Sequence, residues 1–200
     1  MKVTPNPMQH IDSGRRPNTQ RTRLSSLAAR LLGTLVLVGL VGLGGCALQQ
    51  EPPPQITGPV DKVVVRKSIR QLQLVSGGQV VRKYRISLGG SPVGHKYREG
   101  DQRTPVGDYT LNWRNPNSNY YKAIHISYPS DRDRMVSRQL GYSPGGMIMI
   151  HGLPNYVLSE DLRKQYAGRD WTHGCIAVQN HEIDEIWRLV PDGTPIQILP

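Results

Sequence analysis

Cys175 has the sequence neighbours that thiol chemistry needs. It ends the run Trp-Thr-His-Gly-Cys at 171–175, and a second histidine, His151, closes the apolar run Ile-Met-Ile-His at 148–151. A free thiol is mostly protonated near neutral pH, so a nearby imidazole is needed to take its proton or, as imidazolium, to stabilise the thiolate. Gly174 has no Cβ atom, which lets backbone N–H groups approach a tetrahedral intermediate. These residues predict a nucleophilic cysteine; the alternative is an inert buried thiol.

The first part of the chain has the pattern of an export signal. Residues 1–30 carry six basic residues against one acidic, and an uncharged stretch rich in Leu, Val and Gly follows at 31–45. A positive segment, an apolar segment and small residues at its end are typical of a signal peptide, which we expect over residues 1–45. An uncleaved membrane helix is the alternative, because the run extended to Leu48 approaches the ~18 to 20 apolar residues that a span needs.

Cys46 follows the signal directly, in the run Leu-Gly-Gly-Cys at 43–46. This run is similar to a bacterial lipobox, which implies that Cys46 is lipidated and begins the mature chain. We then expect an exported, periplasmic protein anchored to a bacterial membrane through that lipid, and Ala47 favours the outer membrane. The chain has only two cysteines, so a lipid on Cys46 leaves Cys175 a free thiol in an oxidising compartment.

A proline-rich linker separates this anchor from the folded part. Four prolines lie between residues 47 and 59, and they exclude helix and sheet ladders while favouring extended polyproline geometry. We therefore expect a linker over 46–60 and one domain over 61–200. Half of the formal charge of +10 comes from residues 1–30, so the domain's remaining charge does not argue for a nucleic-acid partner.

Short strands dominate the expected domain. Apolar residues recur with period 2, and the pair Gly77-Gly78 supplies the positive φ angles of a tight hairpin between two of the runs. Two helices are expected, at 159–166 and 180–190. The first begins at a serine and the second at an asparagine, and glycine or proline follows the end of each. The expected strands lie at 62–68, 70–75, 80–88, 109–113, 123–128, 147–150, 175–178 and 195–199. His125 is expected on the outward face of a strand, and His95, His181 and the charged run 131–134 in solvated loops or at helix starts.

The two halves of the Cys/His pattern resemble the L,D-transpeptidase (YkuD-type) catalytic domain of bacterial peptidoglycan enzymes. That family has His-Gly at a strand end, a variable loop, and then Ser/Thr-His-Gly-Cys, matched here at 151–152 and 172–175. The segment Gly-Asp-Gln-Arg-Thr-Pro-Val-Gly-Asp-Tyr at 100–109 looks like the family's upstream block. The resemblance covers residues 61–200 and implies a mainly β fold: a β-sandwich of mixed, mostly antiparallel strands with two or three short helices.

The resemblance also implies a role for each matched residue. Cys175 would be the nucleophile and His151 the general base, with the Gly152 carbonyl orienting the other ring nitrogen of the base. His173, Gly174 and Cys175 would line the oxyanion site. The substrates implied are peptidoglycan stem peptides, and no cofactor is implied.

Three further residues are expected to contact substrate, and two features depart from the family pattern. Arg103 could pair with a substrate carboxylate or instead pin its own turn; Trp171 could be core or cleft wall, and Thr172 lies beside the thiol. Ala177 stands where the family often has Arg, and the loop between the two histidines is long. We expect its residues 154–170 to form a mobile flap over the cleft.

The leading functional interpretation is acyl transfer, in which the thiolate attacks a stem-peptide amide and the acyl group passes to a second amine. A peptidoglycan amide hydrolase shares the first half-reaction and is the main alternative, with water as the acceptor. A zinc site made by His151, His173, Cys175 and His181 and a non-catalytic wall-binding lipoprotein are two further possibilities.

Overall fold

The computed structural model of the protein describes residues 58–200. The predicted signal peptide at 1–45, the lipidation site Cys46 and most of the linker at 46–60 lie outside the described residues. Within the described part, none of the helices has the length and apolarity that crossing a bilayer requires.

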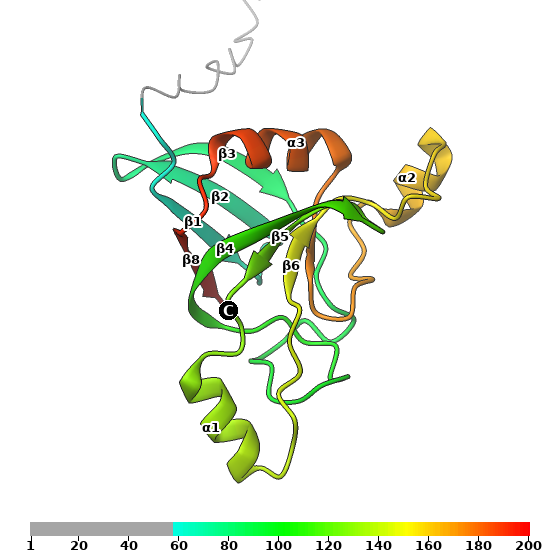
Figure 1. Ribbon diagram of the computed structural model, residues 1–200. Helices are drawn as coiled ribbons and strands as arrows, with labels where there is room; N and C mark the ends of the chain where they lie inside the picture. The colour runs from blue at the N-terminus through cyan, green and yellow to red at the C-terminus, as the bar shows by residue number, and fades with distance from the viewer. Residues whose placement is uncertain (1–57) are drawn as a thin grey trace, which may run out of the picture. The chain divides into compact units, whose positions relative to one another are not determined.

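Within residues 58–200, eight strands form one mixed sheet in the order β3-β2-β1-β8-β4-β5-β6-β7 (Figure 1). All neighbouring strands are antiparallel except the pairs β1/β8 and β6/β7. The strands are β1 (Lys62–Arg66), β2 (Gln71–Ser76), β3 (Gln79–Arg85), β4 (Gly107–Ser118), β5 (Tyr121–Ile126), β6 (Met149–His151), β7 (Ile176–Ala177) and β8 (Thr194–Leu199). The predicted mainly β, mostly antiparallel fold is confirmed.

The sheet curls until its two ends meet, and this curl produces the two layers expected of a sandwich. Just beyond β3, Ser87 pairs with Ala177 of β7 through two backbone hydrogen bonds of 2.9 Å. A second isolated bridge joins Gly89 to Thr172. The curl therefore brings the segment after β3 into contact with the segment that carries Cys175, although the two segments are far apart in the sequence.

Alternation along the strands places the apolar residues on one face, as the period-2 pattern predicts. Val63, Val65, Leu72 and Leu74 are fully buried, and the β2–β3 turn uses Gly77-Gly78 with φ angles of +57° and +79°, as the hairpin prediction requires. The helix α3 (Asn180–Leu189) covers this core, into which it buries Ile183 and Ile186.

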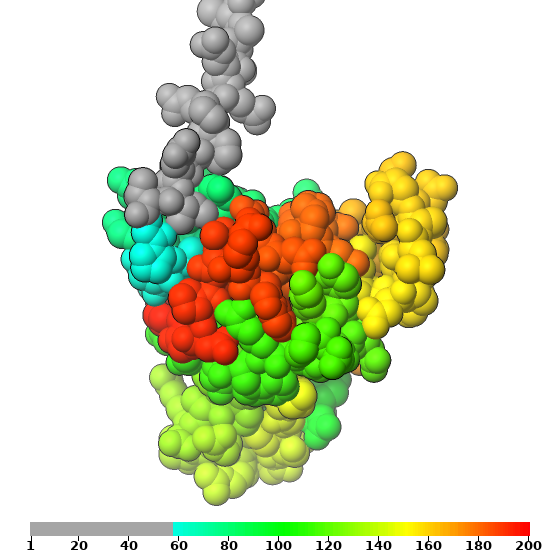
Figure 2. Space-filling view, turned by 45° about the horizontal axis from the view of Figure 1, so that its top comes forward, coloured from blue at the N-terminus to red at the C-terminus, as the bar shows by residue number. Residues whose placement is uncertain are grey.

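The three helices in the described part of the chain differ in how they are held. α2 (Glu160–Tyr166) begins where predicted, since the Ser159 side chain accepts a hydrogen bond from Leu162 N–H, but it buries no residue. Figures 1 and 2 show α2 standing out from the domain beside the start of α3. The third helix, α1 (Asp131–Gln139), occupies the charged run that the sequence assigned to a solvated loop or a helix start.

The charged run forms the first turn of α1, as the helix-start alternative predicts, but Asp133 is buried and α1 itself was not among the two predicted helices. Polar contacts hold this helix. Its buried residues are Asp133 and Ser137. The Asp133 carboxylate accepts a hydrogen bond from Tyr109 Oη at 3.1 Å and lies 3.1 Å from His95 Nε2, while Ser137 Oγ donates to the Tyr97 carbonyl at 2.6 Å. A helix docked in this way needs no apolar stripe, so hydrophobic periodicity could not reveal it.

Candidate active site

A small cavity brings together most of the residues that the sequence singled out. It has a volume of about 100 Å³, and its lining consists of Tyr120, His151, Trp171, Thr172, His173 and Cys175. The parallel pairing of β6 with β7 creates it, because Ile150 lies opposite Ile176 and His151 opposite Ala177. His151 at the end of β6 and Cys175 just before β7 therefore reach the same hollow.

His151 is a buried imidazole with a defined tautomer. Its Nδ1 lies 2.7 Å from the Gly152 carbonyl oxygen, which can only accept, so Nδ1 carries the proton and Nε2 keeps its lone pair. Burial lowers the pKa of His151 to about 4, although the Gly152 contact acts in the opposite direction. At neutral pH His151 is thus an uncharged ring with a free acceptor nitrogen, which is the form that a general base needs.

Cys175 is a half-buried residue, and its Sγ donates a hydrogen bond to the Met147 carbonyl oxygen at 3.6 Å. Burial raises the pKa of this thiol, while a backbone hydrogen bond from Met149 and the positive charge of Lys96 partly oppose the rise. Together with the pKa of His151, this indicates a resting pair of neutral thiol and neutral imidazole. Proton transfer must then accompany attack on the substrate.

The turn before Cys175 accepts glycine alone at position 174. Gly174 has a φ of +124°, and a Cβ atom there would lie 2.6 Å from the Arg103 carbonyl oxygen. The Thr172 hydroxyl accepts a hydrogen bond from Gly174 N–H at 3.1 Å and donates to the Cys175 carbonyl at 2.8 Å. Because Gly174 N–H is engaged by Thr172, the candidate oxyanion donors in this turn are the amides of His173 and Cys175.

These hydrogen bonds give Thr172, which also lines the cavity, a structural role that the sequence did not predict. The sequence placed it among the substrate-binding residues, but both functions of its hydroxyl are used inside the turn. Its side chain is buried. Thr172 therefore holds the shape of the Cys175 turn.

Trp171 is a wall of the cavity. Its ring centroid lies 5.7 Å from that of His151 and 5.0 Å from that of Tyr166 in α2, both in edge-to-face geometry. Its Nε1 is buried and has no hydrogen-bond partner among residues 58–200, so ring packing alone positions the indole. Tyr120, whose ring lies 4.6 Å from His151, completes the wall; the sequence analysis missed it because it comes from the distant β4–β5 turn.

Arg103 does not line the catalytic cavity. Its guanidinium Nη1 donates to the His95 carbonyl at 3.4 Å, and the side chain lines a separate hollow with Tyr97 and Asp101. What Arg103 brings to the site is its carbonyl oxygen, which faces Gly174. Of the two alternatives that the sequence left open, the contacts within residues 58–200 favour pinning of its own loop.

A buried ion pair organises this upstream loop. Lys96 Nζ lies 2.9 Å from Asp101 Oδ1, and both side chains are nearly inaccessible to solvent. Asp101 also accepts hydrogen bonds from the amides of Tyr97, Arg98 and Arg103, and these contacts help to lower the pKa of its carboxyl. The pair therefore fixes the loop that packs against Gly174.

His95 and Lys67 hold the ends of the same loop. His95 Nδ1 accepts a hydrogen bond from Val106 N–H at 3.0 Å, and its other ring nitrogen faces Asp133. The sequence placed His95 in a solvated loop or at a helix start; it lies in a loop but is only partly exposed. Lys67 Nζ donates to the carbonyls of Gly94 and Thr104. Burial lowers the pKa of Lys67 to about 8.

The zinc alternative finds no support in the described part of the chain. Across residues 58–200, no three His, Cys, Asp or Glu side chains converge so that they could hold a metal ion. His181 lines a different hollow from the one that contains Cys175.

Comparison with known proteins places this geometry in a family. The family model for the YkuD L,D-transpeptidase catalytic domain matches residues 61–198. The Escherichia coli (strain K12) protein named "Putative L,D-transpeptidase YafK" is 31% identical over 172 residues, which cover 82% of this chain and 61% of YafK. The chain therefore matches about three fifths of that relative's length.

Solved structures agree with the sequence match. The helical cell shape determining protein Pgp2 from Campylobacter jejuni aligns with a TM-score of 0.50 and 28% identity, over 71% of this chain and 48% of Pgp2. Its K307A mutant aligns with a TM-score of 0.51 at the same identity, over 72% and 48%. The fold, the Cys/His cavity and the family match lead to one conclusion: the chain belongs to the YkuD L,D-transpeptidase catalytic-domain family.

Proposed function

We propose that the protein is a peptidoglycan L,D-transpeptidase that works through a thioester on Cys175. The observation that carries this proposal is the convergence of the Cys175 thiol and the neutral, carbonyl-oriented His151 in one cavity. Membership of the family supports the same activity. The substrates are stem peptides, in which the thiol attacks the amide between an L-centre and a D-residue.

In the first half-reaction, His151 Nε2 takes the thiol proton as Cys175 Sγ attacks the carbonyl carbon of that amide. The amides of His173 and Cys175 donate to the oxygen that gains charge, which is the stabilisation that acyl transfer requires. His151 then returns the proton to the leaving nitrogen, the C–N bond breaks, and a thioester remains. No carboxylate is needed to orient the base, because the Gly152 carbonyl fulfils that role.

The test is incubation of the purified protein with defined muropeptides, with the products identified by mass. A new cross-link or an exchanged terminal residue supports the transpeptidase, and a shortened stem peptide alone supports the hydrolase. Intact substrate after long incubation, with a correctly folded protein, refutes both and leaves the wall-binding alternative.

Hydrolysis remains a second candidate because of one observation on α2. This helix buries none of its residues, and its last residue, Tyr166, packs against Trp171 in the wall of the catalytic cavity. We propose that this segment controls the ratio of hydrolysis to transfer. Shortening it between Asn155 and Gly168 is expected to change that ratio more than the acylation rate; slowed acylation at an unchanged ratio would show that the segment only supports His151.

We also propose that the domain acts from a membrane outside the cytoplasm. The support is the basic and apolar segment before Cys46 and the proline-rich linker after it. Pgp2 is described as determining helical cell shape, and a role in cell shape is proposed here by similarity. Labelling with a fatty-acid analogue should modify the wild type and leave Cys46→Ala unmodified, and fractionation should place the wild type in the outer membrane.

A further inference from the structure

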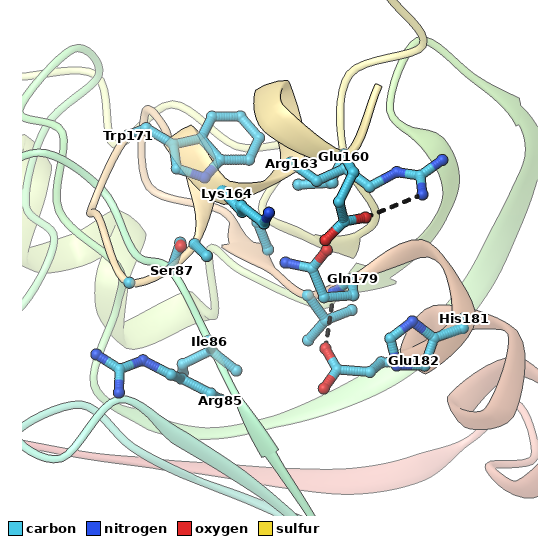
Figure 3. A pocket seen from close by; sticks show the side chains of 15 residues that line it. Arg85, Ile86, Ser87, Glu160, Arg163, Lys164, Trp171, Gln179, His181 and Glu182 are labelled. Carbon is cyan, nitrogen blue, oxygen red and sulfur yellow. Dashed lines mark hydrogen bonds and ion pairs between the residues drawn. The ribbon is translucent and has the colours of Figure 1, made fainter. Parts of the chain in front are cut away.

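A second hollow lies directly beside the catalytic cavity, and we name it the α2–α3 pocket. It has a volume of about 400 Å³ and is bounded by α2, the start of α3 and the chain that leaves β3 (Figure 3). Trp171 lines both hollows, so its indole is the wall between them. The larger volume and the shared wall make this pocket a candidate second subsite.

The pocket continues the surface that carries the reacting groups. Leu153 and Ala177 line it, and they follow His151 and Cys175 by two residues each. The Cα atoms of residues two apart along a chain lie no more than about 7 Å from each other. A peptide group in the pocket would therefore lie within reach of the thioester on Cys175.

The charges in the pocket suit an anion. Arg85 from β3 and Lys164 from α2 both line it, and Figure 3 shows them on different sides of the hollow. The Arg85 side chain makes no hydrogen bond or ion pair with any of residues 58–200, and Lys164 has only a solvent-exposed contact of 3.9 Å with Asp161. Two cations with little internal compensation are thus available to a ligand.

The acidic residues of the pocket are already engaged. The Glu182 carboxylate accepts a hydrogen bond from Gln179 N–H at 2.7 Å as part of the α3 cap. The Glu160 carboxylate lies 3.5 Å from Arg163 Nη1, as the dashed lines in Figure 3 show. These contacts leave Arg85 and Lys164 as the charges that a carboxylate would meet.

Building on the proposed transpeptidase function, we propose that the α2–α3 pocket binds a carboxylate of the acceptor stem peptide. The catalytic cavity of about 100 Å³ holds the acyl group on Cys175 and has no room for a second peptide. The acceptor amine attacks the thioester carbonyl, the N–C bond forms and the C–S bond breaks. The amine proton passes to His151 Nε2 and from there to the departing Cys175 thiolate.

The position of the pocket favours the acceptor over the donor. An incoming amine must be deprotonated by His151, so the acceptor has to approach from the side of that ring. The pocket lies on this side, because its wall Trp171 packs edge-to-face on His151 and its lining residue Leu153 comes two residues after His151. Arg85 and Lys164 would hold the acceptor's carboxylate while its amine reaches past Trp171.

The test compares Arg85→Gln with Arg66→Gln in the full chain. Arg66 is also an exposed arginine at the end of a strand, but it does not line the pocket. With a muropeptide donor alone, acylation of Cys175 is expected to stay within about twofold of wild type in both variants. With increasing acceptor, Arg85→Gln is expected to raise the KM for the acceptor about tenfold and Arg66→Gln less than twofold.

Two further measurements make the outcome decisive. An acceptor whose carboxylate is amidated should be poor for the wild type and no worse for Arg85→Gln. Calorimetric titration of the carboxylate acceptor into Cys175→Ala, with and without Arg85→Gln, measures binding without turnover and should show the same tenfold loss.

Each contrary result has a separate meaning. Slower acylation of Arg85→Gln with an unchanged acceptor KM would assign the pocket to the donor and overturn the proposal. Equal behaviour of Arg85→Gln and Arg66→Gln would remove any role for the pocket. Absence of Cys175 acylation in the wild type would refute the proposed function itself, and the binding titration would still decide whether the pocket takes a carboxylate.

Discussion

Burial of His151 makes the folding stability of this domain depend on pH in a predictable way. Its pKa in the folded chain is about 4, against about 6.5 for an unperturbed imidazole. The folded pKa lies below the unfolded one, so between pH 6.5 and 4 the unfolded chain binds a proton that the folded chain does not. Stability is unaffected above pH 6.5, falls as the pH drops through this window, and loses nothing further to His151 below pH 4.

The size of the loss follows from the difference between the two pKa values. At about 1.4 kcal/mol per pKa unit, His151 alone removes about 3 kcal/mol of the free energy of unfolding between pH 7 and pH 4. His151→Asn removes the titrating ring but keeps an amide donor for the Gly152 carbonyl. The free energy of unfolding can be measured by urea unfolding at pH 7.5, 6.0, 5.0 and 4.0. Its decrease between pH 7.5 and pH 4.0 should be about 3 kcal/mol smaller for His151→Asn than for the wild type.

His125→Asn is the matched control. Burial also lowers the pKa of His125, but this ring lies against Trp113 with its Nδ1 2.7 Å from Asn112 Oδ1 near the surface. Its substitution should change the pH dependence much less. If the wild type and His151→Asn lose equal stability between pH 7.5 and 4.0, the claim that His151 is buried in the neutral form is wrong.

Three further substitutions test the packing and the roles around Cys175. Gly174→Ala should reduce activity at least 100-fold, because the Cβ atom would lie 2.6 Å from the Arg103 carbonyl. Gly193→Ala, at another positive φ but in open space, should leave activity within twofold of wild type. Equal rates for the two variants would refute the predicted clash at Gly174. Asp101→Asn should lower the free energy of unfolding by about 3 to 5 kcal/mol, because it leaves the Lys96 charge buried without its carboxylate partner. Asp161→Asn, in a solvent-exposed pair, should cost less than about 0.5 kcal/mol. If denaturant melts give similar losses of unfolding free energy for both variants, the buried pair is not structural. His173→Ala should slow turnover less than His151→Ala, whose loss of a general base is worth ~10² to 10⁴ in rate; steady-state kinetics giving the reverse order would exchange the two assignments.

Local patterns predicted the parts of the fold that local chemistry determines. Period-2 alternation predicted β1 and β2. The pair Gly77-Gly78 predicted the turn between β2 and β3, and Ser159 predicted the start of α2. β4 runs from Gly107 to Ser118, longer than the expected 109–113, because its pairing with β5 continues through polar residues that show no alternation. The order of strands in the sheet, with β8 between β1 and β4, depends on long-range pairing that no local pattern reports.

In the candidate active site, too, the sequence predicted some features, and others depend on how distant segments pack. The resemblance to the family implied that His151 and Cys175 act together, and the structure places both in one cavity. The engagement of Thr172 inside its turn and the removal of Arg103 from the cavity depend on how the 95–104 loop packs. The α2–α3 pocket combines residues from β3, α2 and α3, so only the curled sheet brings its lining together.

The proposed function requires that Cys175 carries the acyl group. Its most direct test is the intact mass of the protein after brief incubation with a defined muropeptide and quenching in acid, followed by mapping of the modified peptide. The wild type is expected to gain the mass of the donor stem without its released D-residue, attached at Cys175, and Cys175→Ala is expected to gain none. An adduct at another residue, or undiminished turnover in Cys175→Ala, would refute Cys175 as the nucleophile.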